Sequence, residues 1–159
     1  MRRQRSVVVS LKDGLDAIAE LDLSNVMSRL QSPPPRGKSW SPEKAADAEK
    51  WYRRFLAVTL KYPTEVTAPN EDVDEVWHMH VLDMEQYEED TTRIFGHVLY
   101  HKPTFGQIDL TNQFRTTNEL LRHEFGEAPP ITEHYAPASC CSGVNISKAE
   151  LNSALGLAV

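Results

Sequence analysis

The stretch SPEKAADAEKWYRRFLAVTLKYP, residues 41–63, is the part of the sequence that decides the fold. Ser41 is a residue type that caps helix N-termini, Pro42 suits the first helical position, and the acidic Glu43 complements the helix dipole. Apolar residues follow at helical spacing, and they are Ala48, Trp51, Tyr52, Phe55, Leu56 and Leu60. The stretch therefore predicts a long amphipathic helix that ends near Pro63 and buries one face in the core.

Three further segments carry apolar residues at the spacing of a helix. They are residues 11–30, 71–94 and 109–125. Gly14 and the stretch Leu23-Ser24-Asn25 interrupt the first segment, which predicts either one helix or two short ones. Gly96 and Gly126 are suited to end the other two segments. No segment is typical of paired strands, so we expect a mostly α-helical, single-domain irregular bundle with long connections.

The chain divides into three parts by composition. Residues 1–42 predict an N-terminal helical segment and a proline-rich connector, since three consecutive prolines exclude helix there. Residues 43–126 predict a helical core, and residues 127–159 an irregular, flexible tail. The tail holds the two cysteines of the chain, Cys140 and Cys141, which are adjacent and so cannot form a stabilising disulfide framework.

Composition and charge exclude several classes of protein. With 40% hydrophobic and 25% charged residues, the 159-residue chain has a globular profile. No apolar run approaches the roughly 20 residues of a membrane span, and the short run at residues 7–9 is cut off by Lys12, so we expect neither a membrane protein nor export. The presence of only two cysteines, adjacent in sequence, fits a reducing cytoplasm. No basic stripe supports nucleic-acid binding, and the nine carboxylates in residues 71–92 favour a solvated helix face over a cationic partner.

The histidines are concentrated between Asp74 and His101. Successive residues of a helix turn by about 100°, so His78 and His80 point about 160° apart and cannot bind one ion together on a regular helix. His80 lies at the centre of the predicted buried face, and His78 lies on the acidic face beside Asp74. The zinc-protease motif is absent, because Val98 follows the first histidine of the pair His97 and His101.

Two interpretations of His80 follow from this spacing. In the first, His80 forms a buried hydrogen-bond network with Asp83 and Tyr87, which fixes the packing of the helix. In the second, His80 binds a metal ion, with Asp83 as a second ligand or as the group that orients the imidazole. Spacing alone favours the network and leaves both open.

The sequence around the histidines resembles a known family. Residues 74–83, DEVWHMHVLD, and the later Tyr87, Asp90, Phe95, Gly96, Leu99, His101, Pro103, Phe105 and Gly106 are similar to the core of the glycine-rich domain-containing-protein-like family. The similarity spans about residues 45–130, and the chain departs from the family pattern at Thr91, Tyr100, Lys102 and Thr104. The resemblance implies that one site or one structural signature comprises Asp74, Trp77, His78, His80, Asp83, Tyr87 and His101. It implies no particular reaction.

The leading hypothesis is a small cytoplasmic metal-binding protein, or a metal-dependent enzyme that modifies a small molecule or a peptide. Its predicted ligands are His80, His101 and Asp83, with His78 joining them if the helix is distorted there. Tyr87 and Asp83 are the catalytic candidates, with Tyr87 as a hydrogen-bond donor that either supports the ligands or faces the substrate. Imidazole and carboxylate ligands suit a divalent transition metal, that is iron, copper or zinc.

The alternative hypothesis is a non-enzymatic interaction or accessory protein. Its His80, Asp83 and Tyr87 cluster is structural, and its acidic helix meets a partner protein. Under this hypothesis metal chelators leave the thermal stability unchanged.

Overall fold

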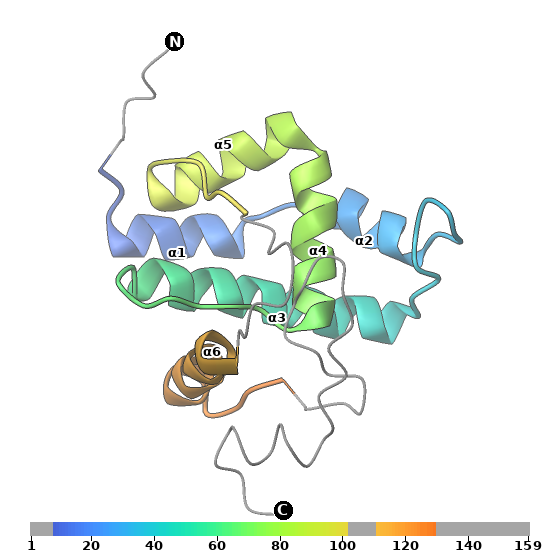
Figure 1. Ribbon diagram of the computed structural model, residues 1–159. Coiled ribbons are helices and arrows are strands. Elements are labelled where there is room, and N and C mark those ends of the chain that lie inside the picture. The colour runs from blue at the N-terminus through green and yellow to red at the C-terminus, as the bar shows by residue number, and fades with distance from the viewer. Residues whose placement is uncertain (1–7, 102–110, 130–159) are drawn as a thin grey trace, which may run out of the picture.

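The computed structural model describes residues 8–101 and 111–129, and these ranges fold into helices without any strand (Figure 1). The helices are α1 (Leu11–Ala19), α2 (Ser24–Gln31), α3 (Pro42–Lys61), α4 (Glu71–Leu82), α5 (Met84–Phe95) and α6 (Thr111–Phe125). The predicted helical bundle is confirmed for this part of the chain. The predicted flexible tail lies almost entirely outside the described residues. None of the described helices has both the length and the hydrophobicity that a membrane crossing requires.

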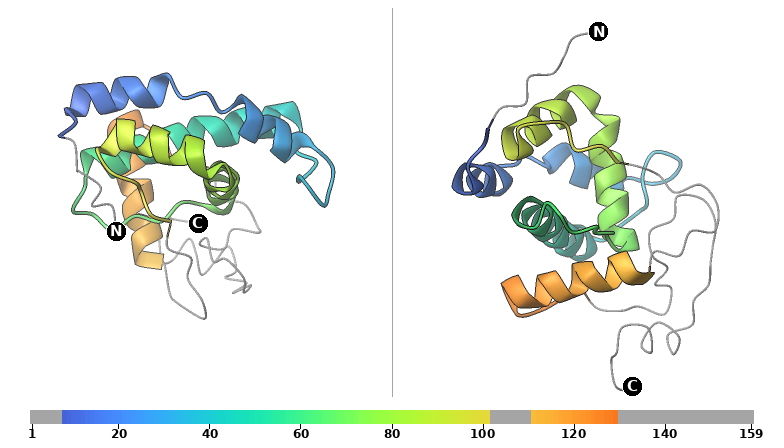
Figure 2. Two further views of the ribbon diagram at one scale, coloured as in Figure 1. Left: turned by 90° about the horizontal axis from the view of Figure 1, so that it is seen from above. Right: turned by 60° about the vertical axis from the view of Figure 1, so that its left-hand side comes forward.

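Helix α3 lies at the centre of the bundle. The Ser41 side chain caps it by accepting a hydrogen bond from the Lys44 backbone N–H at 3.2 Å, with Pro42 in the first turn, as the sequence predicts. Helices α1, α2, α4 and α6 all pack on α3, and α6 lies on the opposite side of it from α1 (Figures 1 and 2). The apolar face of α3 is buried as expected, so it supplies the main wall of the core.

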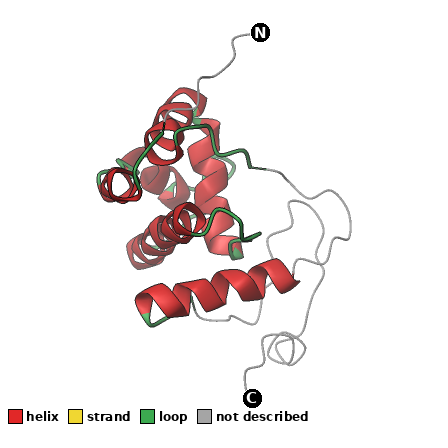
Figure 3. Cartoon of the chain, turned by 90° about the vertical axis from the view of Figure 1, so that its left-hand side faces the viewer, coloured by secondary structure: helices red, strands yellow, loops and turns green. Residues whose placement is uncertain are grey.

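The predicted helix over residues 71–94 is in fact two helices, α4 and α5, that meet at Asp83. Asp83 has φ −91° and ψ 75°, outside the helical region, and the chain changes direction there (Figures 1 and 3). Packing explains the break, since α4 packs on α2 and α3 while α5 packs on α1. A single straight helix could not make both sets of contacts.

The turn at Asp83 brings residues ten positions apart into contact. On a continuous helix such residues would be about 15 Å apart along the axis. Here the Trp77 indole Nε1 lies 2.7 Å from the Tyr87 hydroxyl, and His80 Nε2 lies 3.1 Å from an Asp90 carboxylate oxygen. The break therefore brings Trp77 to Tyr87 and His80 to Asp90.

Gly14 lies where α1 packs closely against α3 and α5. A Cβ atom at this position would lie 2.6 Å from a methyl carbon of Leu60 and 2.7 Å from the backbone carbonyl oxygen of Ile94. Alanine would gain up to about 1 kcal/mol of helix propensity, but the Ile94 carbonyl belongs to α5 and cannot move without shifting that helix. We expect Gly14→Ala to lower the free energy of unfolding by about 1–3 kcal/mol in urea denaturation.

The matched control for this prediction is Ser28→Ala, an exposed substitution in the middle of α2. We expect it to change the free energy of unfolding by less than about 0.5 kcal/mol. A Gly14→Ala variant as stable as the wild type would show that α1 does not approach α5 this closely.

Candidate metal centre

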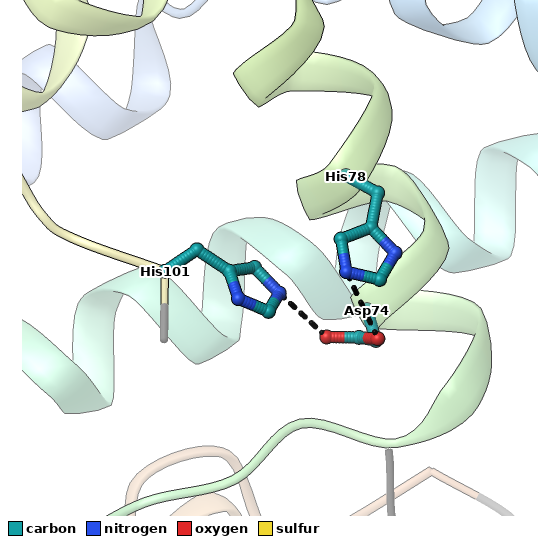
Figure 4. Close-up of side chains that lie close together, drawn as sticks. All are labelled: Asp74, His78 and His101. Atoms are coloured by element: carbon teal, nitrogen blue, oxygen red, sulfur yellow. Dashed lines mark hydrogen bonds and ion pairs between the residues drawn. The ribbon is translucent and has the colours of Figure 1, made fainter. Parts of the chain in front are cut away.

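Three side chains with metal-binding groups converge beside the N-terminal half of α4 (Figure 4). Asn70 caps this helix, because its side-chain oxygen accepts a hydrogen bond from the Val73 backbone N–H at 2.8 Å. Asp74 and His78 lie four residues apart on α4 and therefore share a face. His101 reaches them from the non-helical segment that follows α5.

The Asp74 carboxylate lies between the two imidazoles. His101 Nε2 is 2.9 Å from one oxygen of Asp74, and His78 Nε2 is 3.5 Å from the other. The two rings are stacked, with centroids 4.6 Å apart and planes at 24°. One ligand atom from each residue lies within 4.8 Å of the other two. Ligand atoms about 2.1 Å from one tetrahedral ion lie about 3.4 Å apart, so these three groups are close enough to bind one ion.

Burial makes this cluster favourable for a cation. The Asp74 side chain is 10% exposed and the His101 side chain 13%, whereas His78 is 30% exposed. A buried carboxylate needs a partner of opposite charge or a set of hydrogen bonds, and the N-terminal turns of α4 favour its negative charge. The cluster is therefore closed on the side of Asp74 and His101 and most accessible on the side of His78.

The Trp77 ring contacts His101, and Tyr87 bonds to Trp77. The centroid of the Trp77 ring system lies 4.2 Å from that of the His101 ring, and the Trp77 Nε1–H donates to the Tyr87 hydroxyl. That hydroxyl donates in turn to the Leu99 carbonyl. Burial raises the pKa of Tyr87 to about 12, so the phenol remains protonated at neutral pH. Tyr87, predicted as a catalytic donor, thus has its hydroxyl bonded within the protein.

His80 belongs to a different network, in which Tyr52, His80 and Asp90 are buried. Its Nδ1 lies 2.9 Å from the Tyr52 hydroxyl and its Nε2 lies 3.1 Å from Asp90, whose other carboxylate oxygen accepts from Gln86. Burial lowers the pKa of His80, and a neutral imidazole with its proton on Nε2 satisfies both bonds. The predicted buried position is confirmed, since His80 is 2% exposed. Tyr87 contacts the ring edge-on at 5.0 Å.

The structure does not assemble the predicted ligand set of His80, His101 and Asp83. Asp83 is exposed at the junction of α4 and α5, and its side chain is not a hydrogen-bond partner of His80 among the described contacts. The helical distortion that would bring His78 to His80 does not occur, because both residues lie within α4. The cluster keeps His78 and His101 from the prediction and has Asp74 in place of His80 and Asp83.

Asp74 is not among the predicted ligands, although the sequence carries a local signal for it. Asp74 and His78 have the i, i+4 spacing that places two side chains together on a helix. The remaining ligand, His101, is 27 residues from Asp74 along the chain, and its approach depends on the fold. Local spacing therefore identifies two of the three groups.

Over residues 8–101 and 111–129, the fold and the cluster define a small helical protein with a candidate two-histidine, one-carboxylate metal site. The chain belongs to the UCP032817-like family, whose model matches residues 22–138 and so includes every residue of the cluster. No curated protein and no solved structure gives a significant match to the chain.

Proposed function

We propose that the protein binds one divalent transition metal ion through Asp74, His78 and His101 and is a metal-dependent enzyme. The observation that carries this proposal is the buried Asp74 carboxylate with an imidazole nitrogen against each of its oxygens. A buried carboxylate is normally paired or coordinates a metal, and a cation shared by all three residues would supply that partner.

Within the part of the chain that the structure describes, the cluster supplies three ligands, and this number suits catalysis better than a purely structural ion. Structural zinc sites are closed by four protein ligands, whereas catalytic sites have three and leave a position open. Two histidines and one carboxylate are also the ligands of many non-haem iron enzymes, and imidazole suits copper as well. The open position would take water or the substrate on the accessible side near His78, and a small molecule or a peptide is the substrate class we propose.

The resemblance of residues 74–106 to the glycine-rich domain-containing-protein-like family is part of the same proposal. That resemblance groups Asp74, His78 and His101 with Trp77 and Tyr87. The contacts of the described residues support this grouping, because Trp77 and Tyr87 hold the segment that carries His101.

The test is metal analysis of protein purified without a histidine tag, followed by thermal melting with and without a chelator. We expect one iron, zinc or copper ion per chain. At a free metal concentration of about 100 times Kd, binding stabilises the fold by about 2.7 kcal/mol, and chelation should lower Tm by about 5–10 °C.

His97→Ala is the matched control for His101→Ala in this experiment. Both histidines lie in the non-helical segment that follows α5, but His97 is exposed and is not part of the cluster. We expect His97→Ala to retain the ion through purification and His101→Ala to lose it there, because its two remaining ligands bind the ion only weakly. A wild-type protein without bound metal and with a chelator-insensitive Tm would overturn the proposal and favour a non-enzymatic interaction protein.

A further inference from the structure

We propose that Tyr87 is a positioning residue whose hydroxyl holds His101 in place for metal binding. This inference rests on the proposed metal function and adds to it a residue that does not touch the ion. Of the three ligands, Asp74 and His78 are held by α4, whereas His101 comes from a segment without regular secondary structure. The affinity of the site should therefore depend on what holds that segment.

One hydroxyl connects the two parts of the structure that orient His101. The Tyr87 hydroxyl donates a hydrogen bond to the carbonyl of Leu99, two residues before His101. It also accepts a hydrogen bond at 2.7 Å from the indole of Trp77, against which the His101 ring packs. The Tyr87 hydroxyl oxygen therefore bonds both to the backbone that precedes His101, at Leu99, and to the Trp77 indole, which the His101 imidazole contacts.

The position of Tyr87 argues against a direct chemical role. The residue is 5% exposed, its O–H bond is directed at a carbonyl oxygen, and the indole N–H approaches its oxygen. No proton is free to be given to a substrate. A group with this arrangement acts on the metal site through His101.

The expected effect follows from the loss of preorganisation. When Phe replaces Tyr87, the ring remains and the bond to Leu99 is lost, so the segment carrying His101 samples more conformations before it binds the ion. Groups that orient metal ligands typically change metal affinity 10- to 100-fold when they are removed. We expect the Kd of Tyr87→Phe for Zn²⁺ to rise about tenfold or more.

Tyr52→Phe is the matched control. It also removes one buried phenolic hydroxyl and retains the ring, but the hydroxyl of Tyr52 bonds to His80, which is not a ligand in the cluster. Both variants should lose some stability, so Kd is measured at a temperature at which circular dichroism shows both to be folded. We expect Tyr52→Phe to bind Zn²⁺ within about twofold of the wild type.

A double-mutant cycle with His101→Ala distinguishes positioning from general loosening of the fold. If Tyr87 acts through His101, Tyr87→Phe should weaken the binding of Co²⁺ in the wild-type background and leave the residual affinity of His101→Ala unchanged. The visible absorption spectrum of the Co²⁺ complex of Tyr87→Phe should shift toward that of His101→Ala, whereas the spectrum of Tyr52→Phe should match the wild type.

The outcomes separate this inference from the function on which it rests. If the wild type binds the metal and Tyr87→Phe binds it as Tyr52→Phe does, the positioning role is overturned and the metal site stands. An equal loss in both backgrounds of the cycle likewise overturns the role. If the wild type binds neither Zn²⁺ nor Co²⁺, the metal function itself is overturned, and the positioning role with it.

Discussion

Replacing Asp74 by asparagine should weaken the binding of a divalent transition metal at least about 100-fold, which corresponds to about 2.7 kcal/mol. The substitution retains the size and one hydrogen-bond acceptor of the side chain, so the contact to His101 can persist. It removes the negative charge from a position that is 90% buried, where screening by solvent is weak and the attraction between the charge and the ion is large. Isothermal titration with Zn²⁺ measures the change.

Asp72→Asn provides the control for this prediction. Asp72 also lies in the first turn of α4, but its side chain is 42% exposed and pairs with Lys44 rather than with a histidine. We expect its Kd to stay within about threefold of the wild type, because an exposed charge contributes little. Equal Kd values for the two asparagine variants would mean that the Asp74 carboxylate is not a ligand.

Replacing His80 by alanine should lower the free energy of unfolding by about 3–5 kcal/mol. The substitution removes the partner of a buried carboxylate, Asp90, and of a buried hydroxyl, Tyr52, and it leaves a cavity in the core. Chemical denaturation of the metal-free protein measures the loss. The imidazole is not part of the candidate metal site, so the folded variant should still bind the ion.

Two further variants make this prediction decisive. His97→Ala removes an exposed imidazole and should change the stability by less than about 0.5 kcal/mol. Tyr52→Phe removes only one hydrogen bond to His80 and should lower the stability by about 1–2 kcal/mol, which remains measurable if His80→Ala does not fold. A stable His80→Ala variant that no longer binds metal would reverse the roles that we assign to His80 and Asp74.

Much of the helical structure could be predicted because its signals are local. Ser41, Pro42 and the apolar spacing that follows specify α3 without reference to the rest of the chain. The opposite directions of His78 and His80 were also predictable, since two residues on one helical turn have a fixed angle between them. The prediction holds, as His80 is buried and His78 faces Asp74.

The end of α4 could not be predicted in the same way. The sequence around Asp83 has neither proline nor glycine, and the apolar spacing continues through it. The chain turns there because α5 gains contacts with α1 that a straight continuation of α4 would not reach. This gain depends on a helix about 70 residues earlier, so no local window contains the information.

The sequence by itself determined which segments are helical and which faces of α4 carry His78 and His80. Only the tertiary structure decided which carboxylates His80 and His101 meet: Asp90 for His80, through the turn at Asp83, and Asp74 for His101, through the segment after α5. The reason is physical. The direction of a side chain on a helix follows from its position along that helix, whereas a hydrogen bond of about 3 Å between separate elements depends on how those elements pack against each other.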